Sequence, residues 1–359
     1  MLLGCYEPVI MGLEEAEVGV AWINSAKSIE YLLTGGRDIL SGKYLGLKTD
    51  KSCTTFDEPF DGYLRQLDYT VDLAIEFAQK QSKYNVLMNP SPIYSSTFAE
   101  CIEKGRDVHE YPLKYNNFSL KCFGLATVVD SLCAIRKFVF DKGEITLSEL
   151  AKALGNNWAG YEDLRIKILN DKDKYGNGLE LPDSIMQKIT EHLEEKYVGK
   201  VFFGGRKLRF GLDSIDTHLY RGRVTAATPD GRLAGEPLSR NLCPSPGMDR
   251  AGITGYMQSV LKINSAAFLN SAILDFTMHP SAVDGEKGLV DFASLIRIFF
   301  EGGGFAVQGN IVSVETLRSA QADPRTYSTL QIRVCGWNEY FVRMSKNKQD
   351  YFIKESELK

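Results

Sequence analysis

The chain has 359 residues, of which 44% are hydrophobic and 25% are charged, as in an ordinary globular protein. Its formal net charge of −4 does not favour binding to nucleic acid or to an anionic membrane surface, and no run of eighteen apolar residues predicts a transmembrane helix. Residues 1–5 do not show a basic region followed by a long apolar one, so we do not expect them to be part of a Sec signal. The seven cysteines show no paired spacing, which argues against a disulfide framework or a metal site. Reduced thiols are the default in the cytosol, so we expect a cytoplasmic protein.

The predicted elements alternate between helices and strands. Helix-like segments cover residues 22–34, 67–82, 123–140, 286–301 and 344–354. Capping residues predict two more helices: Thr146 and Glu149 have the form of a capping box, and Asp183 is expected to cap a helix that runs to about Lys196. The pattern over residues 201–211 is strand-like. This alternation predicts an α/β protein.

A second strand is predicted near the C-terminus, where Leu330, Ile332 and Val334 alternate with polar residues. It leads to Gly336, and a helix-like stretch is expected to follow. Most glycines at such a place form a bulge or end a strand. A glycine can also lose one α-hydrogen to leave a planar radical that is delocalised into the amides on both sides.

Near the N-terminus, Cys5 and Glu7 are two residues apart, and such side chains point the same way in an extended segment. A thiol can exchange a hydrogen atom with a glycyl radical, and a carboxylate can take a proton from a substrate. Each residue also has an ordinary interpretation. A free cysteine is usually a small core residue, and Glu7 could form a salt bridge at a strand edge.

Further motifs are spread over most of the chain, at residues 4–8, 114–119, 228–232, 308–310 and 333–337. The most distinctive are Thr-Pro-Asp-Gly-Arg at 228–232 and Arg-Val-Cys-Gly-Trp at 333–337. In this order, the motifs resemble those of the glycyl radical enzymes, the pyruvate formate-lyase family. In that family the first motif is the loop of the thiyl-radical cysteine and the last is the loop of the radical glycine.

The resemblance implies a ten-stranded α/β barrel made of two half-barrels, in which the Cys loop and the Gly loop meet at the centre. Residues 1–310 would be the C-terminal portion of that barrel, starting at the Cys loop, and residues 311–359 the glycyl radical domain. Family members are longer, and their Cys loop lies near the middle of the chain. We therefore expect the C-terminal half of such an enzyme, whether from a truncated gene model, a split gene or a true half-subunit.

The resemblance also implies the chemistry and the partners. A separate S-adenosylmethionine-dependent iron–sulfur activase would remove a hydrogen from Gly336, and the radical would then take the hydrogen of Cys5. The Cys5 thiyl would abstract a hydrogen from a small substrate, with Glu7 as general base. No bound cofactor and no metal are expected, and the full-length form is expected to be a homodimer.

Within the family, the Cys-x-Glu arrangement of Cys5 and Glu7 is similar to that of dehydratases, eliminases and decarboxylases. The expected reaction is therefore the cleavage of a C–O, C–N, C–C or C–S bond of a small metabolite by a lyase of anaerobic metabolism. Formate C-acetyltransferase-like acyl transfer is the alternative, and it is opposed because Tyr6 stands where that enzyme has a second cysteine. Dehydratases of the family carry an Asp at a position that corresponds to about Gly19 of this chain. Its absence here weakens an assignment as a glycerol-type dehydratase. A third alternative is an inactive fragment, or a subunit that needs a separate N-terminal half.

Overall fold

The computed structural model describes residues 2–3, 6–15, 17, 19–49 and 53–357. Its parallel strands form two groups. The three-stranded sheet has the order β3-β4-β5, and the two-stranded sheet pairs β6 with β7. The strands are β3 (Ala21–Asn24), β4 (Asn117–Phe123), β5 (Lys207–Gly211), β6 (Ile273–Met278) and β7 (Ala306–Ile311).

A parallel bridge between Gly211 and Ser271 joins the two groups. There the Leu212 amide donates to the Ser271 carbonyl at 2.7 Å. The strands from β3 to β7 therefore follow one another across a single parallel array in chain order. Parallel neighbours require crossover connections, and the helices between the strands supply them.

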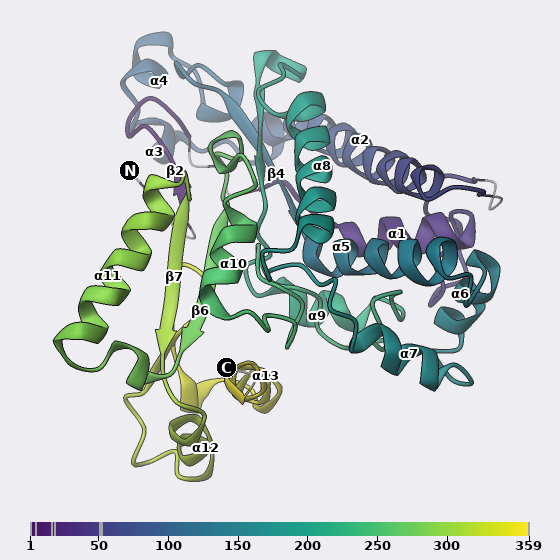
Figure 1. The fold of residues 1–359 in the computed structure, drawn as a ribbon. Helices are drawn as coiled ribbons and strands as arrows, with labels where there is room; N and C mark the ends of the chain where they lie inside the picture. Colours follow the sequence, from purple (N-terminus) through teal and green to yellow (C-terminus); the bar gives the residue numbers. More distant parts are fainter. Residues whose placement is uncertain (1, 4–5, 16, 18, 50–52, 358–359) are drawn as a thin grey trace.

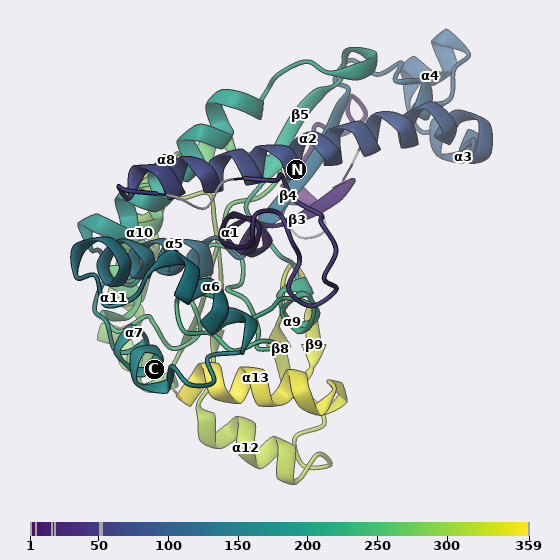
Figure 2. The same cartoon turned by 90° about the vertical axis from the view of Figure 1, so that its right-hand side faces the viewer.

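The two faces of β4 differ because side chains alternate along a strand. Phe118, Leu120 and Cys122 enter the main hydrophobic core, whereas Lys121 makes polar contacts on the other face. Helices cover the apolar face, and Figure 2 shows α1 and α2 there. These helices are α1 (Ser25–Thr34), α2 (Asp57–Met88), α5 (Leu125–Ala134) and α8 (Glu180–Tyr197).

Two helices, α10 (Gly252–Val260) and α11 (Gly285–Glu301), accompany β6 and β7 (Figure 1). Further helices before the C-terminal segment are α3 (Pro92–Ser95), α4 (Ala99–Lys104), α6 (Leu147–Gly155), α7 (Glu162–Leu169) and α9 (Thr217–Arg223). Near the N-terminus, β1 (Leu2–Leu3) pairs antiparallel with β2 (Glu7–Pro8). None of the described helices is long and apolar enough to span a membrane.

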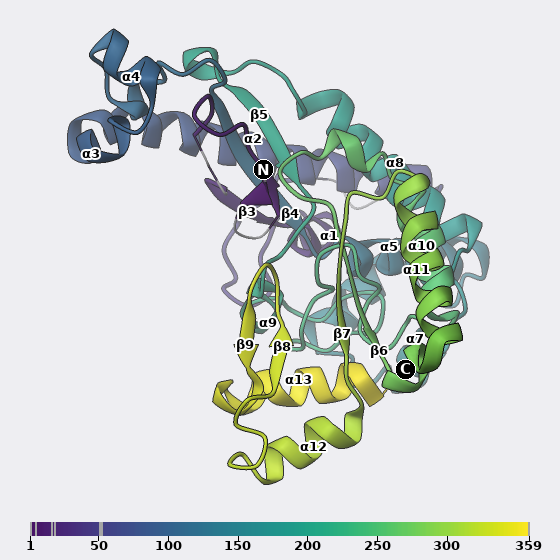
Figure 3. The ribbon, with the colours of Figure 1, turned by 90° about the vertical axis from the view of Figure 1, so that its left-hand side faces the viewer.

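The C-terminal segment has a hydrophobic cluster of its own, which includes Leu317, Ile332, Phe341 and Phe352. Its elements are α12 (Val314–Ala322), β8 (Gln331–Arg333), β9 (Asn338–Tyr340) and α13 (Lys346–Glu357). β8 and β9 form an antiparallel hairpin that rises beside β7 (Figure 3). The Val334 amide closes the tip by donating to the Trp337 carbonyl at 3.0 Å. Gly336 therefore lies at the tip of the hairpin.

Several local predictions are confirmed. The helix predicted over 286–301 is α11, and the Thr146 capping box forms as expected. The Thr146 hydroxyl accepts from the Glu149 amide at 3.2 Å, and the Glu149 carboxylate accepts from the Thr146 amide at 2.9 Å. Both hydrogen bonds connect residues three apart, so the local sequence is enough to specify them.

Other predictions are wrong in their bounds or their type. Residues 22–24 belong to β3, and α1 begins only at Ser25, after the Asn24 cap. Asp183 lies inside α8, which starts at Glu180. Pro182 is tolerated in the first turn of this helix, because backbone N–H groups there have no intrahelical acceptor and the missing N–H of proline costs no hydrogen bond.

The stretch after Gly336 is a strand and not a helix. Gly336 has a φ of +77°, which suits glycine and reverses the chain. Asn338 then pairs with Arg333 across the hairpin. In the same way, only residues 207–211 of the stretch predicted over 201–211 form a strand, because residues 203–205 form a short helical turn.

Candidate active site

Residues from opposite ends of the chain meet at the tip of the β8–β9 hairpin. Cys5 lies outside the described residues, and its neighbour Tyr6 is described. The Tyr6 hydroxyl donates to Gln308 Oε1 at 2.6 Å and accepts from Arg333 Nη2 at 3.0 Å. Burial raises the pKa of the Tyr6 phenol, so it keeps the proton that it donates. The residue beside Cys5 is thus held against the hairpin that carries Gly336.

Gln308 on β7 connects Tyr6 with Gly336. Its Oε1 also accepts from the Gly336 amide, at 3.3 Å, and its Nε2 donates to the Val334 carbonyl at 3.0 Å. Only 7% of Gln308 is exposed. We call Tyr6, Gln308 and Gly336 the loop clamp, because these contacts join the residue after Cys5 to Gly336.

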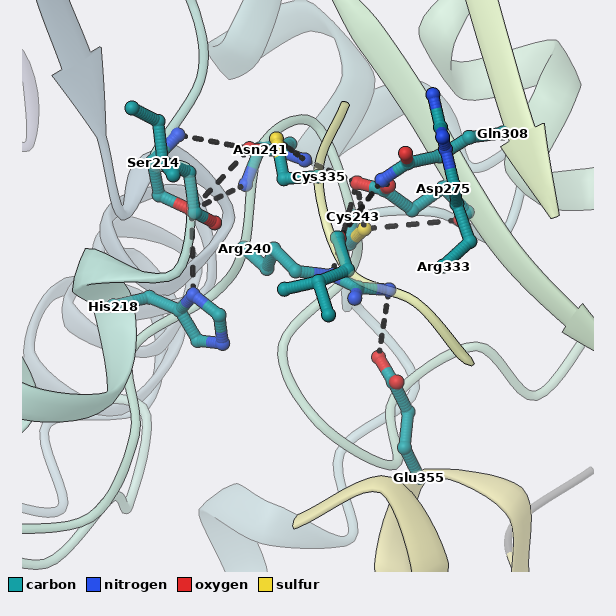
Figure 4. A network of polar contacts seen from close by, with 12 residues as sticks. Ser214, His218, Arg240, Asn241, Cys243, Asp275, Gln308, Arg333, Cys335 and Glu355 are labelled. Carbon is teal, nitrogen blue, oxygen red and sulfur yellow. Dashed lines mark hydrogen bonds and ion pairs between the residues drawn. The ribbon is translucent and has the colours of Figure 1, made fainter. Parts of the chain in front are cut away.

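A buried polar network adjoins Gln308 of the loop clamp (Figure 4). Asp275 on β6 accepts from Gln308 Nε2 and from Asn241 Nδ2. Burial raises the pKa of Asp275, and the nearby Arg240 guanidinium opposes this. Arg240 lies 3.7 Å from Asp275 and 3.3 Å from Glu355 of α13, so the network extends to the last helix.

Two thiols border this network. The Cys243 thiol donates to Asp275 Oδ2 at 3.5 Å, and burial raises its pKa to about 12. Cys335 is fully buried, and its sulfur accepts from Asn241 Nδ2 at 3.9 Å. A thiol with a raised pKa forms little thiolate, so Cys243 is a packing residue and hydrogen-bond donor here.

Glu7 belongs to a buried group of charges. Lys121 Nζ donates to Glu7 Oε1 at 2.6 Å and to Asp213 Oδ2 at 2.9 Å. Glu7 is 3% exposed, and Lys121 and Asp213 are fully buried. We call these residues the ion triad. The salt bridge considered for Glu7 therefore exists. It is buried, and its partner Lys121 lies in β4.

The ion triad contains two carboxylates and one ammonium. Burial raises the pKa of Asp213 to about 6, against the effect of Lys121. Burial alone would lower the pKa of Lys121, but Asp213 and Glu7 outweigh it and raise that pKa. Glu7 Oε2 is buried and has no hydrogen-bond partner within the described part of the chain. This oxygen keeps acceptor capacity for a proton or a hydroxyl group.

Sequence reasoning missed Lys121, Asp213 and Asp275. Two of them carried a signal, because Lys121 and Asp275 are the charged residues of otherwise uncharged strands. Gln308 was noted as part of a motif, without a role. Asp213 follows β5 and carried no comparable pattern.

The Thr-Pro-Asp-Gly-Arg segment holds a loop in place. Arg232 donates to the carbonyls of Leu233 at 2.9 Å and of Glu236 at 2.7 Å. The loop lines a cavity of about 740 Å³ that Lys348 of α13 also borders. In the described part of the chain, no group of three or more His, Cys, Asp or Glu side chains could hold a metal ion.

Two family models match the chain. The model described as pyruvate formate lyase-like matches residues 1–222, and the model described as glycine radical matches residues 238–342. Trans-4-hydroxy-L-proline dehydratase of Clostridioides difficile is 33% identical over 99% of this chain and 45% of its own length. (2S)-3-sulfopropanediol dehydratase of Klebsiella oxytoca is 30% identical over 99% of this chain and 44% of its own length.

Solved structures agree with these matches. The glycerol-bound B12-independent glycerol dehydratase of Clostridium butyricum superposes with a TM-score of 0.93 at 32% identity, over 98% of this chain and 45% of that chain. The chain therefore spans less than half the length of the relatives that it matches.

Proposed function

The chain belongs to the pyruvate formate lyase-like family of glycyl radical proteins, and on this basis we propose that it carries the radical glycine and the thiyl cysteine of a glycyl radical lyase. Membership confirms the resemblance seen in the motifs. The expected fold class is also confirmed, because the solved relatives share this α/β fold with its parallel strands.

The loop clamp is the observation that carries the proposal. Through Gln308 it connects Tyr6, the residue after Cys5, with Gly336, although these residues lie at opposite ends of the sequence. In the proposed reaction, the Gly336 radical takes the hydrogen atom of Cys5, and the Cys5 thiyl takes a hydrogen atom from the substrate. The roles of Gly336 and Cys5 follow from their positions in the family's motifs.

We assign Glu7 the role of general base. Its Oε2 oxygen has no partner among the described residues, and Lys121 fixes the other oxygen. A carboxylate held in this way can accept a proton from a substrate hydroxyl. The ion triad supports this assignment by holding the carboxylate in one orientation.

The proposed reaction is a lyase reaction on a small metabolite. The relatives named above are dehydratases, and another relative is an isethionate sulfite-lyase from Oleidesulfovibrio alaskensis, 31% identical over 99% of this chain. Acyl transfer of the formate C-acetyltransferase type is disfavoured, because Tyr6 has no thiol and its hydroxyl is engaged by Gln308 and Arg333.

The proposal includes several partners. A radical S-adenosylmethionine activase with an iron–sulfur cluster would install the radical, and a separate N-terminal half would complete the barrel. Homodimerisation and a cytoplasmic location belong to the same proposal. So does a boundary between residues 1–310 and 311–359, which the separate hydrophobic cluster of the C-terminal segment supports.

The test is anaerobic incubation of the chain with the activase, with and without a co-expressed N-terminal half, followed by EPR spectroscopy. A glycyl radical keeps one α-hydrogen, so we expect a doublet that collapses in protein made with α-deuterated glycine. Gly336→Ala should give no signal. Gly155→Ala is the matched control, because an added Cβ there meets no atom within 4 Å.

The outcomes separate the alternatives. A doublet in Gly336→Ala, or no wild-type signal under either condition, contradicts the proposal. A signal that needs the N-terminal half identifies the chain as a subunit. Cys5→Ser should form the radical without turning over substrate, whereas turnover by that variant contradicts the role of Cys5.

A further inference from the structure

We propose that Gln308 is the positioning residue for hydrogen transfer between Gly336 and Cys5. This inference rests on the proposed function and assigns a role to a residue outside the Cys and Gly motifs. Gln308 is nearly buried, and its amide contacts the residue after Cys5, the Gly336 amide and the Val334 carbonyl.

The side-chain amide of Gln308 has one defined orientation, because its oxygen and its nitrogen face different kinds of neighbour. Both neighbours of Oε1, the Tyr6 hydroxyl and the Gly336 N–H, are donors. Both neighbours of Nε2, the Val334 carbonyl and the Asp275 carboxylate, are acceptors. A flipped amide would place its NH2 group against the Gly336 N–H and its oxygen against the two acceptors, so these three neighbours select one orientation.

Asp275 fixes this orientation of the Gln308 amide by accepting from its Nε2. Asn241 donates to one carboxylate oxygen of Asp275, and Gln308 donates to the other. Arg240 lies 3.7 Å away and favours the ionised carboxylate, which can only accept. Gln308 is therefore held by Asp275 of β6 and by Val334, the residue after β8, independently of its contact with Tyr6.

The hydrogen bond from the Gly336 N–H to Gln308 Oε1 is made by the nitrogen that is bonded to the proposed radical carbon. In a glycyl radical the nitrogen lone pair delocalises into the planar Cα. An acceptor on the Gly336 N–H increases the electron density on that nitrogen and so favours the planar radical. Because the same oxygen accepts from Tyr6, Gln308 couples the plane of the radical to the placement of the neighbouring Cys loop.

The transfer itself can be followed without substrate. The S–H bond of Cys5 breaks and a C–H bond forms at Gly336, so one hydrogen atom moves and no external oxidant or reductant is needed. The reverse step regenerates the glycyl radical. Since thiols exchange with solvent, deuterium from D₂O enters Gly336, and the EPR doublet collapses at a rate that reports the transfer.

The experiment compares this collapse rate in activated wild type, Gln308→Ala and Tyr6→Phe, together with the N-terminal half where activation needs it. We expect Gln308→Ala to slow the collapse by at least roughly tenfold, because a misplacement of about 1 Å can cost about a hundredfold. Tyr6→Phe should slow it less, since only one contact of the loop clamp is lost. Gln321→Ala is the control, because Gln321 bonds Gln349 and Asp350, away from Gly336.

Hydrogen–deuterium exchange of backbone amides gives a second readout that needs no radical. The peptide containing Gly336 should exchange faster in Gln308→Ala than in wild type, because the N–H loses its acceptor. If Gln308→Ala does not fold, Tyr6→Phe decides, and a wild-type collapse rate in that variant overturns the proposal.

The remaining outcomes are also distinct. A wild-type collapse rate in folded Gln308→Ala overturns the role of Gln308 while the proposed function stands. If wild type forms no radical, the proposed function fails, and unchanged amide exchange in Gln308→Ala would then refute the loop clamp as well.

Discussion

The side chain of Glu7 enters the ion triad with Lys121 and Asp213, whereas its neighbour Tyr6 enters the amide network around Gln308. Glu7 is buried and Tyr6 is partly buried, and both residues are close to Cys5 in the sequence. The ion triad is held by full charges, so its stability depends on charge balance and pH. The amide network consists of Tyr6, Gln308, Asn241 and Asp275. It contains one carboxylate but is held mainly by matched donors and acceptors of two side-chain amides, so its stability depends more on geometry.

This difference fits the two proposed tasks. A proton acceptor, the role proposed for Glu7, benefits from a fixed charge and a spare oxygen, which the ion triad provides. Hydrogen-atom transfer moves no net charge, so its site benefits from exact spacing more than from charge. The following predictions test the contrast between the two networks, from the largest expected effect to the smallest.

Removing the ammonium from the ion triad should have the largest effect. Lys121→Met leaves two buried carboxylates without a counter-charge, and we expect a loss of about 3–5 kcal/mol of unfolding free energy. Urea unfolding measures this loss. Lys287→Met is the control, because that lysine is 91% exposed in its side chain and its surface pair contributes little. Equal losses in both variants would contradict the ion triad.

The ion triad should also respond to pH through Asp213. Burial raises the folded-state pKa of Asp213 to about 6, so the folded chain retains a proton that the unfolded chain releases near its ordinary value of 3.8. The stability from this proton is full below about pH 4 and is lost as the pH rises to about 6, a change of about 3 kcal/mol.

Unfolding of wild type and Asp213→Asn at several pH values measures this contribution. The stability of wild type relative to the variant should fall between pH 4 and 6 and then remain constant. Parallel pH curves for the two proteins would exclude a raised pKa at Asp213.

The amide network should lose less stability when its charge is removed. Asp275→Asn turns one acceptor into an N–H that faces the donors of Gln308 and Asn241, and we expect a loss of about 2 kcal/mol. Arg240 keeps its contact with Glu355, which limits the loss. Asp350→Asn on α13 is the exposed control. A loss as large as that of Lys121→Met would remove the distinction between the networks.

The smallest effect is expected for Tyr6→Phe. The ring stays in place, and only the hydroxyl that bonds Gln308 and Arg333 is lost, so the expected change is about 1 kcal/mol. Urea unfolding measures it, with Tyr220→Phe at a 48% exposed position as the control. A loss above about 3 kcal/mol would mean that the hydroxyl supports packing beyond its hydrogen bonds.

Local features of the fold were predictable because their interactions span only a few residues. The Thr146 capping box and helix α11 follow from spacings of three and four residues. The prediction of Asp183 as an N-cap is wrong. The same rules allow Pro182 in the first turn of a helix, and α8 accordingly begins earlier, at Glu180. The hairpin after Gly336 was missed because its pairing depends on a backbone turn that the apolar pattern does not show.

The amino-acid sequence by itself determined the family and the α/β class, and it pointed to Cys5, Glu7 and Gly336 as the proposed site residues, because ordered motifs and periodic apolar residues are properties of the chain alone. Only the tertiary structure decided that Glu7 pairs with Lys121 and that Gln308 connects Tyr6 with Gly336. These partners are far apart in sequence, and the parallel array of strands and the β8–β9 hairpin bring them together. Burial then gives the contacts their strength, since it removes the water that would otherwise satisfy the same polar groups.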